Sequence, residues 1–304
     1  MADVFLAYDD HIDRPLAIKI LKEEFRSNTE YVTRFLQESR AAGVMSHPNI
    51  VTIYDVGEAD GFPYIAMELL KGSSLESIIE KRGALPPQEV IKLGRRLAGA
   101  LQYAHENGIV HRDIKPSNIM ISDDGKSTKL LDFGIARLVD ADRESTQASF
   151  AQTQVGQVLG SPRYMSPEQA LGLPVDARTD LFSLGAVLYE AATGHCAFDG
   201  ETLATLALRI TQSTPESIDR LIPDCPKGLS FIVNKLLSKN ADERFPDGAS
   251  LAKALKREEV SQEALGSDGK TRKFPLAVRL SATFGGATAV ALAFALYFIL
   301  DRQE

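Results

Sequence analysis

The stretch that decides the fold runs from His111 to Gly134 and reads HRDIKPSNIMISDDGKSTKLLDFG. It contains two short apolar runs, at residues 119–121 and 129–131. Between them lies Asp123-Asp124-Gly125, and these residue types tolerate turn conformations. Two short apolar runs around such a turn predict a β-hairpin.

The hairpin brings together polar side chains that are far apart in the sequence. If the chain folds back near Gly125, Asn118 at the start of the first strand lies opposite Asp132 at the end of the second. Asp113 and Lys115 lie on the loop just before them. Amide and carboxylate oxygens are ligands that suit Mg²⁺, which completes its octahedron with water and phosphate oxygens. The sequence therefore predicts a divalent-cation site at the open end of the hairpin.

The same stretch resembles two motifs of the protein kinases. His111-Arg112-Asp113 with Lys115 and Asn118 is similar to the catalytic loop, and Asp132-Phe133-Gly134 is similar to the magnesium motif. Either triplet alone is a weak signal, but here both occur in order and at the family's spacing. Lys115-Pro116-x-Asn118 resembles the form found in serine/threonine kinases. The resemblance covers about residues 2–255 and implies the bilobal kinase fold, an α+β architecture with a small β-rich lobe and a larger helical lobe.

The resemblance also implies a role for each residue of this group. Asp113 would orient the substrate hydroxyl and accept its proton, and Lys115 would steady the charge on the transferred phosphoryl group. Asn118 and Asp132 would hold Mg²⁺, with Mn²⁺ as a substitute, and ATP would be the phosphate donor. The expected catalytic residues are Asp113, Lys115 and Asn118.

A lysine near the start of the chain has an apolar setting. Residues 16–21, LAIKIL, read as a strand, and alternation places Lys19 on the same face as Ala17 and Leu21. Burying an ammonium group without a partner is costly, so a counter-charge is expected nearby. The next predicted helix, at about residues 30–44, places Glu38 on its inward face, and we expect an ion pair with Lys19.

The resemblance extends to a nucleotide pocket. Strands are expected at residues 50–57 and 64–67, with Met67 as the gatekeeper beside the adenine and residues 68–70 as the hinge, whose backbone groups would bind the base. In the family, the strand lysine binds the α and β phosphates of the nucleotide. The expected nucleotide-binding residues are Val4, Ala17, Lys19, Glu38, Met67, Glu68, Leu70, Met120 and Asp132.

One part of the family pattern is missing. Kinases carry a glycine-rich loop, G-x-G-x-x-G-x-V, over the phosphates. Val4 aligns with its final valine, so Ala2 stands at the third glycine and the first two would precede Met1. We expect that the sequence begins inside this loop as a truncated or misassigned start; the alternative is a protein that works without its first strand. An unpaired sheet edge and weak nucleotide binding would follow.

The second half of the chain carries further parts of the pattern. Residues 135–164 are polar and resemble an activation segment, in which Thr153 and then Ser149 are the favoured phosphorylation sites, with Arg112 as the phosphate's partner. Glu168 is expected to pair with Arg244, a structural pair in the family. Asp180 heads an apolar helix and is expected to cap the backbone of the catalytic loop.

Composition sets the outer limits of function. The chain has 304 residues, of which 44% are hydrophobic and 25% charged, as in ordinary globular proteins. Its net charge is -7, so no overall basic character points to nucleic acid. The two cysteines, Cys196 and Cys225, lack metal-site spacing and fit a reducing compartment. No N-terminal signal peptide is visible.

The tail predicts a membrane anchor. Residues 258–279 read as a charged juxtamembrane linker, and residues 280–300 contain no charge. About 20 apolar residues span a bilayer as a helix. Lys270, Arg272, Lys273 and Arg279 precede this helix, so the positive-inside rule keeps the kinase domain in the cytoplasm. Small residues at positions 281, 285, 289 and 293 suggest a dimer through the helix.

These features favour a membrane-anchored serine/threonine protein kinase similar to the eukaryotic-like kinases of bacteria. Its expected organisation is a kinase domain at 1–257 (small lobe 1–67, hinge 68–72, large lobe 73–257), the linker and one transmembrane helix in the plasma or inner membrane. Protein substrates, membrane lipid and a homodimer through the kinase domain or the helix are the expected partners, and autophosphorylation is expected to activate the enzyme. Two alternatives remain open, which are a pseudokinase acting as a membrane scaffold and a small-molecule phosphotransferase.

Overall fold

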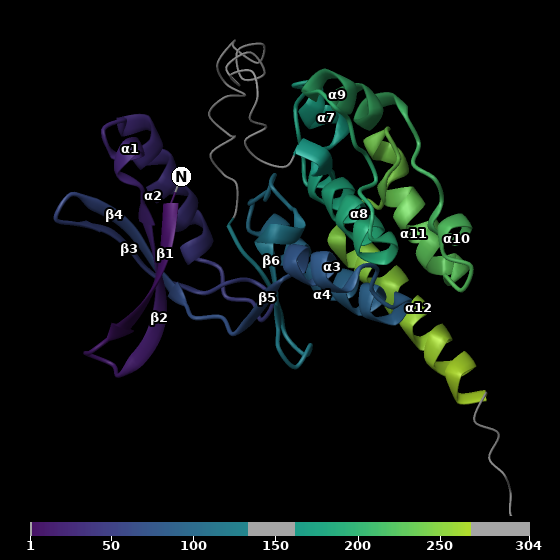
Figure 1. Cartoon of the computed structure of the whole chain (residues 1–304), viewed down its shortest axis with the longest axis horizontal. Coiled ribbons are helices and arrows are strands. Elements are labelled where there is room, and N and C mark those ends of the chain that lie inside the picture. The colour runs from purple at the N-terminus through teal and green to yellow at the C-terminus, as the bar shows by residue number, and fades with distance from the viewer. Residues whose placement is uncertain (1, 133–161, 269–304) are drawn as a thin grey trace, which may run out of the picture. The chain divides into compact units, whose positions relative to one another are not determined.

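The computed structural model describes residues 2–132 and 162–268. Within this range, the side chains of residues 30, 34, 38–42 and 265–268 are outside the description. Residues 2–260 form one compact unit, which begins with a β-sheet and one long helix and continues into a larger, mainly helical part (Figure 1). These are the two lobes that the sequence predicts.

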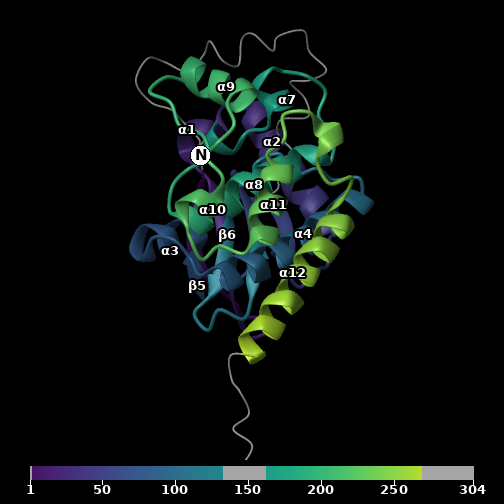
Figure 2. The same ribbon diagram turned by 90° about the vertical axis from the view of Figure 1, so that its right-hand side faces the viewer.

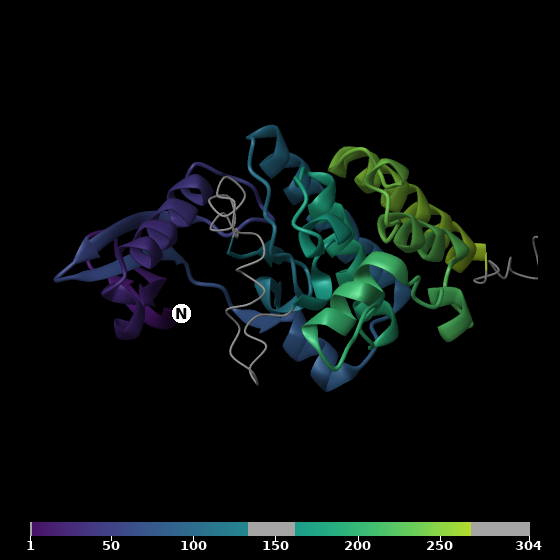
Figure 3. The same ribbon diagram turned by 90° about the horizontal axis from the view of Figure 1, so that it is seen from above.

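The small lobe is built on a four-stranded antiparallel sheet with the order β1-β2-β4-β3. Its strands are β1 (Ala2–Asp9), β2 (Arg14–Leu21), β3 (Ile53–Ala59) and β4 (Phe62–Glu68). The helices α1 (Glu23–Arg26) and α2 (Thr29–Gly43) follow β2, and α2 lies along the sheet (Figure 3). Leu21, Phe35 and Ile65 form the buried core between α2 and the sheet. The alternating pattern of β2 and the helical spacing of α2 therefore meet in one small core.

The predicted hairpin is present and belongs to a second, three-stranded sheet with the order β5-β6-β7. This sheet contains β5 (Gly72–Ser74), β6 (Ile119–Ser122) and β7 (Thr128–Leu130), with the short 3-10 turn η1 (Pro116–Asn118) just before β6. Gly125 takes the left-handed conformation, φ 67°, in the turn between β6 and β7, which explains the need for glycine at that position. Ile119 and Leu130 are fully buried and fix the hairpin against the large lobe.

Helix α8 (Arg178–Thr193) forms the centre of the large lobe. Fourteen of its residues are buried, which agrees with the nearly continuous apolar sequence from Leu181 to Leu188. Several other helices of this lobe surround α8 in Figure 2. The other helices and turns described in this lobe are α3 (Leu75–Arg82), α4 (Pro87–Glu106), η3 (Pro162–Tyr164), α7 (Pro167–Ala170), α9 (Leu203–Gln212), α10 (Ile218–Leu221), α11 (Lys227–Leu236), η4 (Ala241–Glu243) and α12 (Gly248–Asp268).

The end of the globular part differs from the expected linker. Residues 258–268 continue α12 as helix, because this segment is rich in the helix formers Glu, Gln, Ala and Leu and contains no proline. The predicted membrane segment 280–300 lies outside the described residues. Among the described helices, none combines the length and apolar character needed to cross a membrane.

Candidate active site

The catalytic loop is held by one buried carboxylate. Asp180, on α8, is fully buried, and its two oxygens accept hydrogen bonds from the backbone N–H groups of His111 and Arg112, at 2.8 Å each. This confirms the predicted cap. Arg112 has a φ of 64°, a left-handed conformation that is uncommon for a residue with a side chain. The two bonds to Asp180 keep the loop in this conformation.

The predicted catalytic residues lie together. Lys115 donates to Asp113 Oδ2 at 2.7 Å, and Asn118 Nδ2 donates to the backbone oxygen of Asp113 at 2.9 Å and to its Oδ2 at 3.2 Å. The Asp113 side chain stays about one-third exposed, and the Lys115 side chain is 20% exposed. The carboxylate is thus fixed in direction while remaining open to an incoming hydroxyl group.

The hairpin register differs by one residue from the predicted one. Ile119 pairs with Leu130, so Asn118 lies opposite Leu131, and Leu131 N donates to Asn118 O at 2.8 Å. The reason lies in the turn, where Ser122 and Ser127 close a four-residue loop through two hydrogen bonds. Asp132 therefore lies one residue beyond the position opposite Asn118.

His111 connects the catalytic loop to the segment that carries Asp132. Its ring is fully buried; Nδ1 accepts from Asp113 N–H at 3.2 Å, which leaves Nε2–H to donate to Leu131 O at 2.8 Å. Asp132 itself has a φ of 36°, in the left-handed region. The position of Asp132 relative to Asp113 thus depends on the hairpin and on this histidine.

Lys19, on β2 of the small sheet, forms an ion pair with Asp132. Its Nζ lies 2.8 Å from Asp132 Oδ2, with 21% of the lysine side chain and 47% of the aspartate side chain exposed. The predicted partner, Glu38, is on α2, but its side chain lies outside the described residues, so the ion pair with Lys19 stays a prediction. A lysine on the small sheet and an aspartate after the hairpin therefore meet at one point.

One face of the small sheet carries most of the predicted nucleotide residues. In the strand register Val4 pairs with Lys19, Leu6 with Ala17, and Ala17 with Met67, so these side chains share one face. Met120, on β6, pairs with Lys129 of β7 and Ser74 of β5, and Leu70 lies half-buried in the segment between the two sheets. Val4 is 59% exposed, and β1 forms an edge of the sheet.

Two oxygen ligands are available for a cation. Because Asn118 directs its Nδ2 to Asp113, its amide oxygen faces away from that bond, and one oxygen of Asp132 remains beside the one paired with Lys19. Among residues 2–132 and 162–268, no group of three or more His, Cys, Asp or Glu side chains could hold a metal ion. One carboxylate and one amide fit Mg²⁺ bound together with phosphate and water, rather than a metal held by protein ligands alone.

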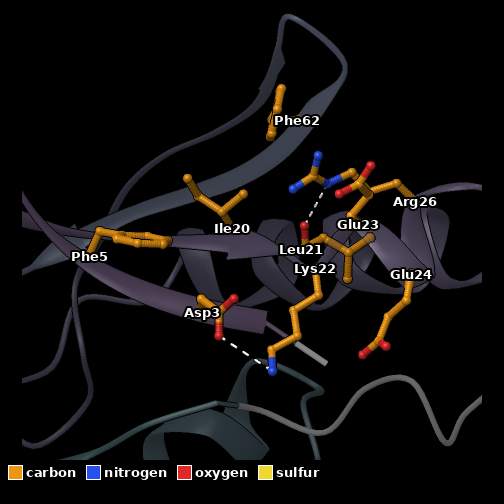
Figure 4. A pocket seen from close by; sticks show the side chains of 9 residues that line it. All are labelled: Asp3, Phe5, Ile20, Leu21, Lys22, Glu23, Glu24, Arg26 and Phe62. Atoms are coloured by element: carbon orange, nitrogen blue, oxygen red, sulfur yellow. Dashed lines mark hydrogen bonds and ion pairs between the residues drawn. The ribbon is translucent and has the colours of Figure 1, made fainter.

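A cavity of about 730 Å³ lies away from this chemistry (Figure 4). Phe5, Ile20 and Phe62 line it, and by strand alternation the first two lie on the face opposite Val4 and Lys19. Figure 4 shows Arg26 donating to Leu21 O, at 2.8 Å, beside it. This cavity therefore does not coincide with the predicted nucleotide pocket.

The predicted Glu168–Arg244 pair is present. Arg244 donates to both oxygens of Glu168, at 2.7 and 2.8 Å, and its guanidinium group is fully buried. Burial alone would raise the pKa of Glu168, but the bonds from Arg244 and Thr179 hold it below its usual value. Thr153 and Ser149 lie outside the described residues, so the proposed phosphorylation sites stay predictions.

One network at the hinge was not predicted. Glu68 was expected to act only through its backbone, yet its side chain forms an ion pair of 2.6 Å with Lys129 on β7. The sequence carried one usable signal, because Lys129 interrupts the apolar run that forms β7 and so needs a partner.

Comparison with known proteins shows the family and the fold of this chain. A family model described as "Protein kinase domain" matches residues 1–258. The chain belongs to the protein kinase family. A crystal structure of the PknI kinase domain from Mycobacterium tuberculosis superposes on this kinase with a TM-score of 0.65 at 25% sequence identity, covering 85% of this chain and 91% of the other. The bilobal kinase fold is therefore shown both by the sequence family and by a solved structure.

The curated relatives that this chain matches include serine/threonine protein kinases of bacteria. PrkC of Bacillus subtilis is 39% identical over 256 residues, which cover 84% of this chain and 38% of the relative. PknB of Mycobacterium leprae is 38% identical over 261 residues, covering 84% of this chain and 41% of the relative. The chain spans about two fifths of the length of these relatives.

Proposed function

We propose that this kinase transfers the γ-phosphate of ATP to serine and threonine hydroxyls of proteins. The observation that carries the proposal is the Asp113 carboxylate, held by Lys115 at 2.7 Å and by Asn118 at 3.2 Å while one-third of it stays exposed. Relatives whose names state serine/threonine kinases match over most of the chain and support this choice. The domain organisation proposed from the sequence, with the kinase domain ending at residue 257, belongs to the same proposal.

Each residue of the site has a distinct task. Asp113 orients the substrate hydroxyl and accepts its proton, and Lys115, beside that carboxylate, stabilises the negative charge on the transferred group. Lys19 binds the nucleotide phosphates, and the ion pair with Asp132 orients its ammonium group. Val4, Ala17 and Met67 enclose the base, while backbone groups of Glu68 and Leu70 bind its edge. Met120 supports the base from the large lobe.

Asn118 and Asp132 would hold the divalent cation. Mg²⁺, or Mn²⁺ in its place, neutralises charge on the nucleotide phosphates when it is bound. The protein's own contribution is to fix the two ligands, through the bonds from Asn118 to Asp113 and the backbone bond from Leu131 to Asn118. Glu38 would be a further partner of the Lys19 ammonium group, as the sequence predicts.

The proposal extends to the membrane and to regulation. The uncharged segment 280–300, preceded by four basic residues, supports a single-pass anchor with the kinase domain in the cytoplasm. Autophosphorylation of the polar segment at residues 135–164 would add charge near the buried Arg112 and order the segment. A homodimer, through the kinase domain or through the small residues of the membrane helix, would allow this reaction in trans.

A pseudokinase that serves as a scaffold is the second candidate. Val4 and Leu6, on the proposed nucleotide face of the edge strand β1, are 59% and 73% exposed, so this edge of the sheet is open to solvent in the described residues. A small-molecule phosphotransferase would share the same base and metal residues. The resemblance of Ser166-Pro167-Glu168 and the polar segment before it to the part of a kinase that docks a protein substrate favours the kinase.

The test is phosphate transfer from ATP to casein, with Asp113→Asn as the comparison. Loss of a general base costs about 10²–10⁴ in rate, so the variant should lose at least about 100-fold while keeping its thermal midpoint. Equal incorporation by both proteins would exclude the assigned base. No incorporation by a folded, nucleotide-binding wild-type protein would favour the scaffold, and transfer only to small hydroxyl compounds would favour the phosphotransferase.

A further inference from the structure

An ion pair joins the hinge to β7, the hairpin strand that leads to Asp132. Lys129 Nζ, from β7, lies 2.6 Å from Glu68 Oε1, at the end of β4. The two side chains are only 16% and 20% exposed. A pair this well covered needs good geometry and further hydrogen bonds to offset the loss of solvation.

Both charged groups also bind the backbone of one intervening segment. Glu68 Oε1 accepts from Thr52 N–H at 2.7 Å, and Glu68 N–H donates to Thr52 O at 2.9 Å. Lys129 Nζ donates to Ile50 O at 3.1 Å. The carboxylate and the ammonium group are therefore both held by residues 50–52, the segment that enters β3.

The same segment is joined to β7 by backbone bonds. Leu130 N donates to Asn49 O at 2.9 Å, and Val51 N donates to Leu130 O at 3.0 Å, which forms an isolated parallel bridge. Asn49 also donates through its side chain to Thr128 O at 2.8 Å. The small sheet and the hairpin sheet are thus connected at this point by a cluster of covered polar contacts.

These polar contacts connect the two parts of the proposed site, the hinge that would bind the base and the segment that carries Asp132. Glu68 follows Met67 and begins the hinge, whereas Lys129 is on β7, three residues before Asp132, which follows the end of that strand. Leu131 lies between Lys129 and Asp132 in the sequence, and its backbone groups are hydrogen-bonded to the Asn118 backbone and to the His111 ring. A shift of Lys129 along its strand would therefore move Asp132, and a shift of Glu68 would move the hinge.

We propose that Glu68 and Lys129 are positioning residues, whose ion pair fixes the hinge relative to Asp132 so that the base and the cation-bound phosphates are held at the correct separation. This inference rests on the proposed function and deepens it. Neither side chain is assigned contact with nucleotide or substrate. Residues that orient metal or substrate ligands from behind typically change affinity or activity by about 10–100-fold when replaced.

The test uses Glu68→Gln, Lys129→Met and the double variant. Each single variant should raise the KM for ATP and the Mg²⁺ concentration for half-maximal activity, lowering kcat/KM by about 10-fold or more. The double variant should lose little more than either single one, because removing both groups leaves no unpartnered charge. Lys129→Arg, which keeps the donor, should recover most of the activity.

The control is Arg82→Met, which breaks an exposed ion pair with Glu89 on the large lobe. It should leave all three kinetic quantities unchanged. A purely structural role predicts lower thermal midpoints for the pair variants with unchanged KM and Mg²⁺ dependence, and that result would overturn the proposal. Additive losses, or a rise in activity on breaking the pair, would also contradict it.

A second readout does not depend on phosphate transfer. The rise in thermal midpoint caused by Mg²⁺ and a non-hydrolysable ATP analogue should be clear in wild type and smaller in both single variants. If wild type binds nucleotide but transfers no phosphate, the proposed function fails while the positioning role is still measured. If the shifts are equal in wild type and the variants, the positioning role fails and the function stands.

Discussion

At the scale of residues, a small number of side chains define the chemistry of the catalytic loop. Asp113 is held by Lys115 and Asn118, and its loop is held by the buried Asp180. All of these bonds involve an ionised group, and such bonds are shorter and stronger than neutral ones. The loop is therefore pre-organised before substrate arrives, which is what a reaction that relies on positioning requires.

The substitution Lys19→Met tests the part of the site that is proposed to bind the nucleotide phosphates. The methionine keeps the length of the side chain but removes the charge that lies 2.8 Å from Asp132. We expect kcat/KM for phosphate transfer to fall by about 10² or more, because a preorganised cation facing the phosphates is lost. Steady-state kinetics measures the loss, and circular dichroism checks that the variant is folded. Activity within about 2-fold of wild type would remove Lys19 from the site.

Residue identities were largely predictable because the charged groups of the site occur at fixed spacing in two short motifs. Asp113, Lys115, Asn118 and Asp132 lie where that spacing puts them, to within one residue of register. Lys129 in an apolar run signals that it needs a partner, but the sequence does not identify Glu68 as that partner, because Glu68 is 61 positions away and the pairing depends on how two sheets meet. Local patterns do not contain that information.

At the scale of elements, the hairpin register depends on its turn. The sequence places the turn at Asp123-Asp124-Gly125, but the loop closes between Ser122 and Ser127. The serine side chain makes this difference, since Ser127 N–H donates to Ser122 Oγ at 2.9 Å. The two apolar runs alone could not choose between the two closures, because they do not specify which residues close the turn.

The substitution Gly185→Ala tests the close packing of α8 against α11. A Cβ at this position of α8 would lie 2.6 Å from Leu236 Cβ on α11, closer than two non-bonded carbon atoms can approach. The helices must move apart, so we expect a loss of about 1–3 kcal/mol in the free energy of unfolding. Urea denaturation measures it. Gly99→Ala on α4, where no atom lies within 4 Å of the added carbon, is the control and should be neutral or slightly stabilising. Equal stability of both variants would contradict the close helix contact.

For the molecule as a whole, the Glu168–Arg244 pair ties together segments 76 residues apart. The folded state lowers the pKa of Glu168 below its ordinary value of 4.5, so the unfolded chain binds the proton more readily. The pair therefore contributes stability above about pH 4.5 and loses it as the pH falls through the lower, folded-state pKa. Thermal midpoints of wild type should fall across this acid range.

The comparison variant is Glu168→Gln, which removes the titrating group and keeps its size. Its thermal midpoint should be lower than that of wild type at pH 7, and the difference should shrink as the pH falls below about 4.5. Differential scanning calorimetry at several pH values measures both. A difference that stays constant with pH would mean that Glu168 does not carry the acid-sensitive part of stability.

The fold class could be predicted for the whole molecule because the motifs of both lobes appear in one order along the chain. The hinge between the lobes was also predicted, but the non-covalent contacts between the two sheets were not, since they depend on the bridge between Ile50 and Leu130 and on a covered ion pair. Segments 133–161 and 269–304 carry the predictions on activation and on the membrane, which remain predictions.

The most direct measurement is a crystal structure of the chain with Mn²⁺ and a non-hydrolysable ATP analogue. We expect an anomalous peak bound by both the Asn118 amide oxygen and the Asp132 carboxylate, at octahedral distances of about 2.0–2.2 Å, with Asp113 facing the space beyond the γ-phosphate. Binding of the ion by other residues, or Asn118 and Asp132 pointing to separate spaces, would contradict the proposed site.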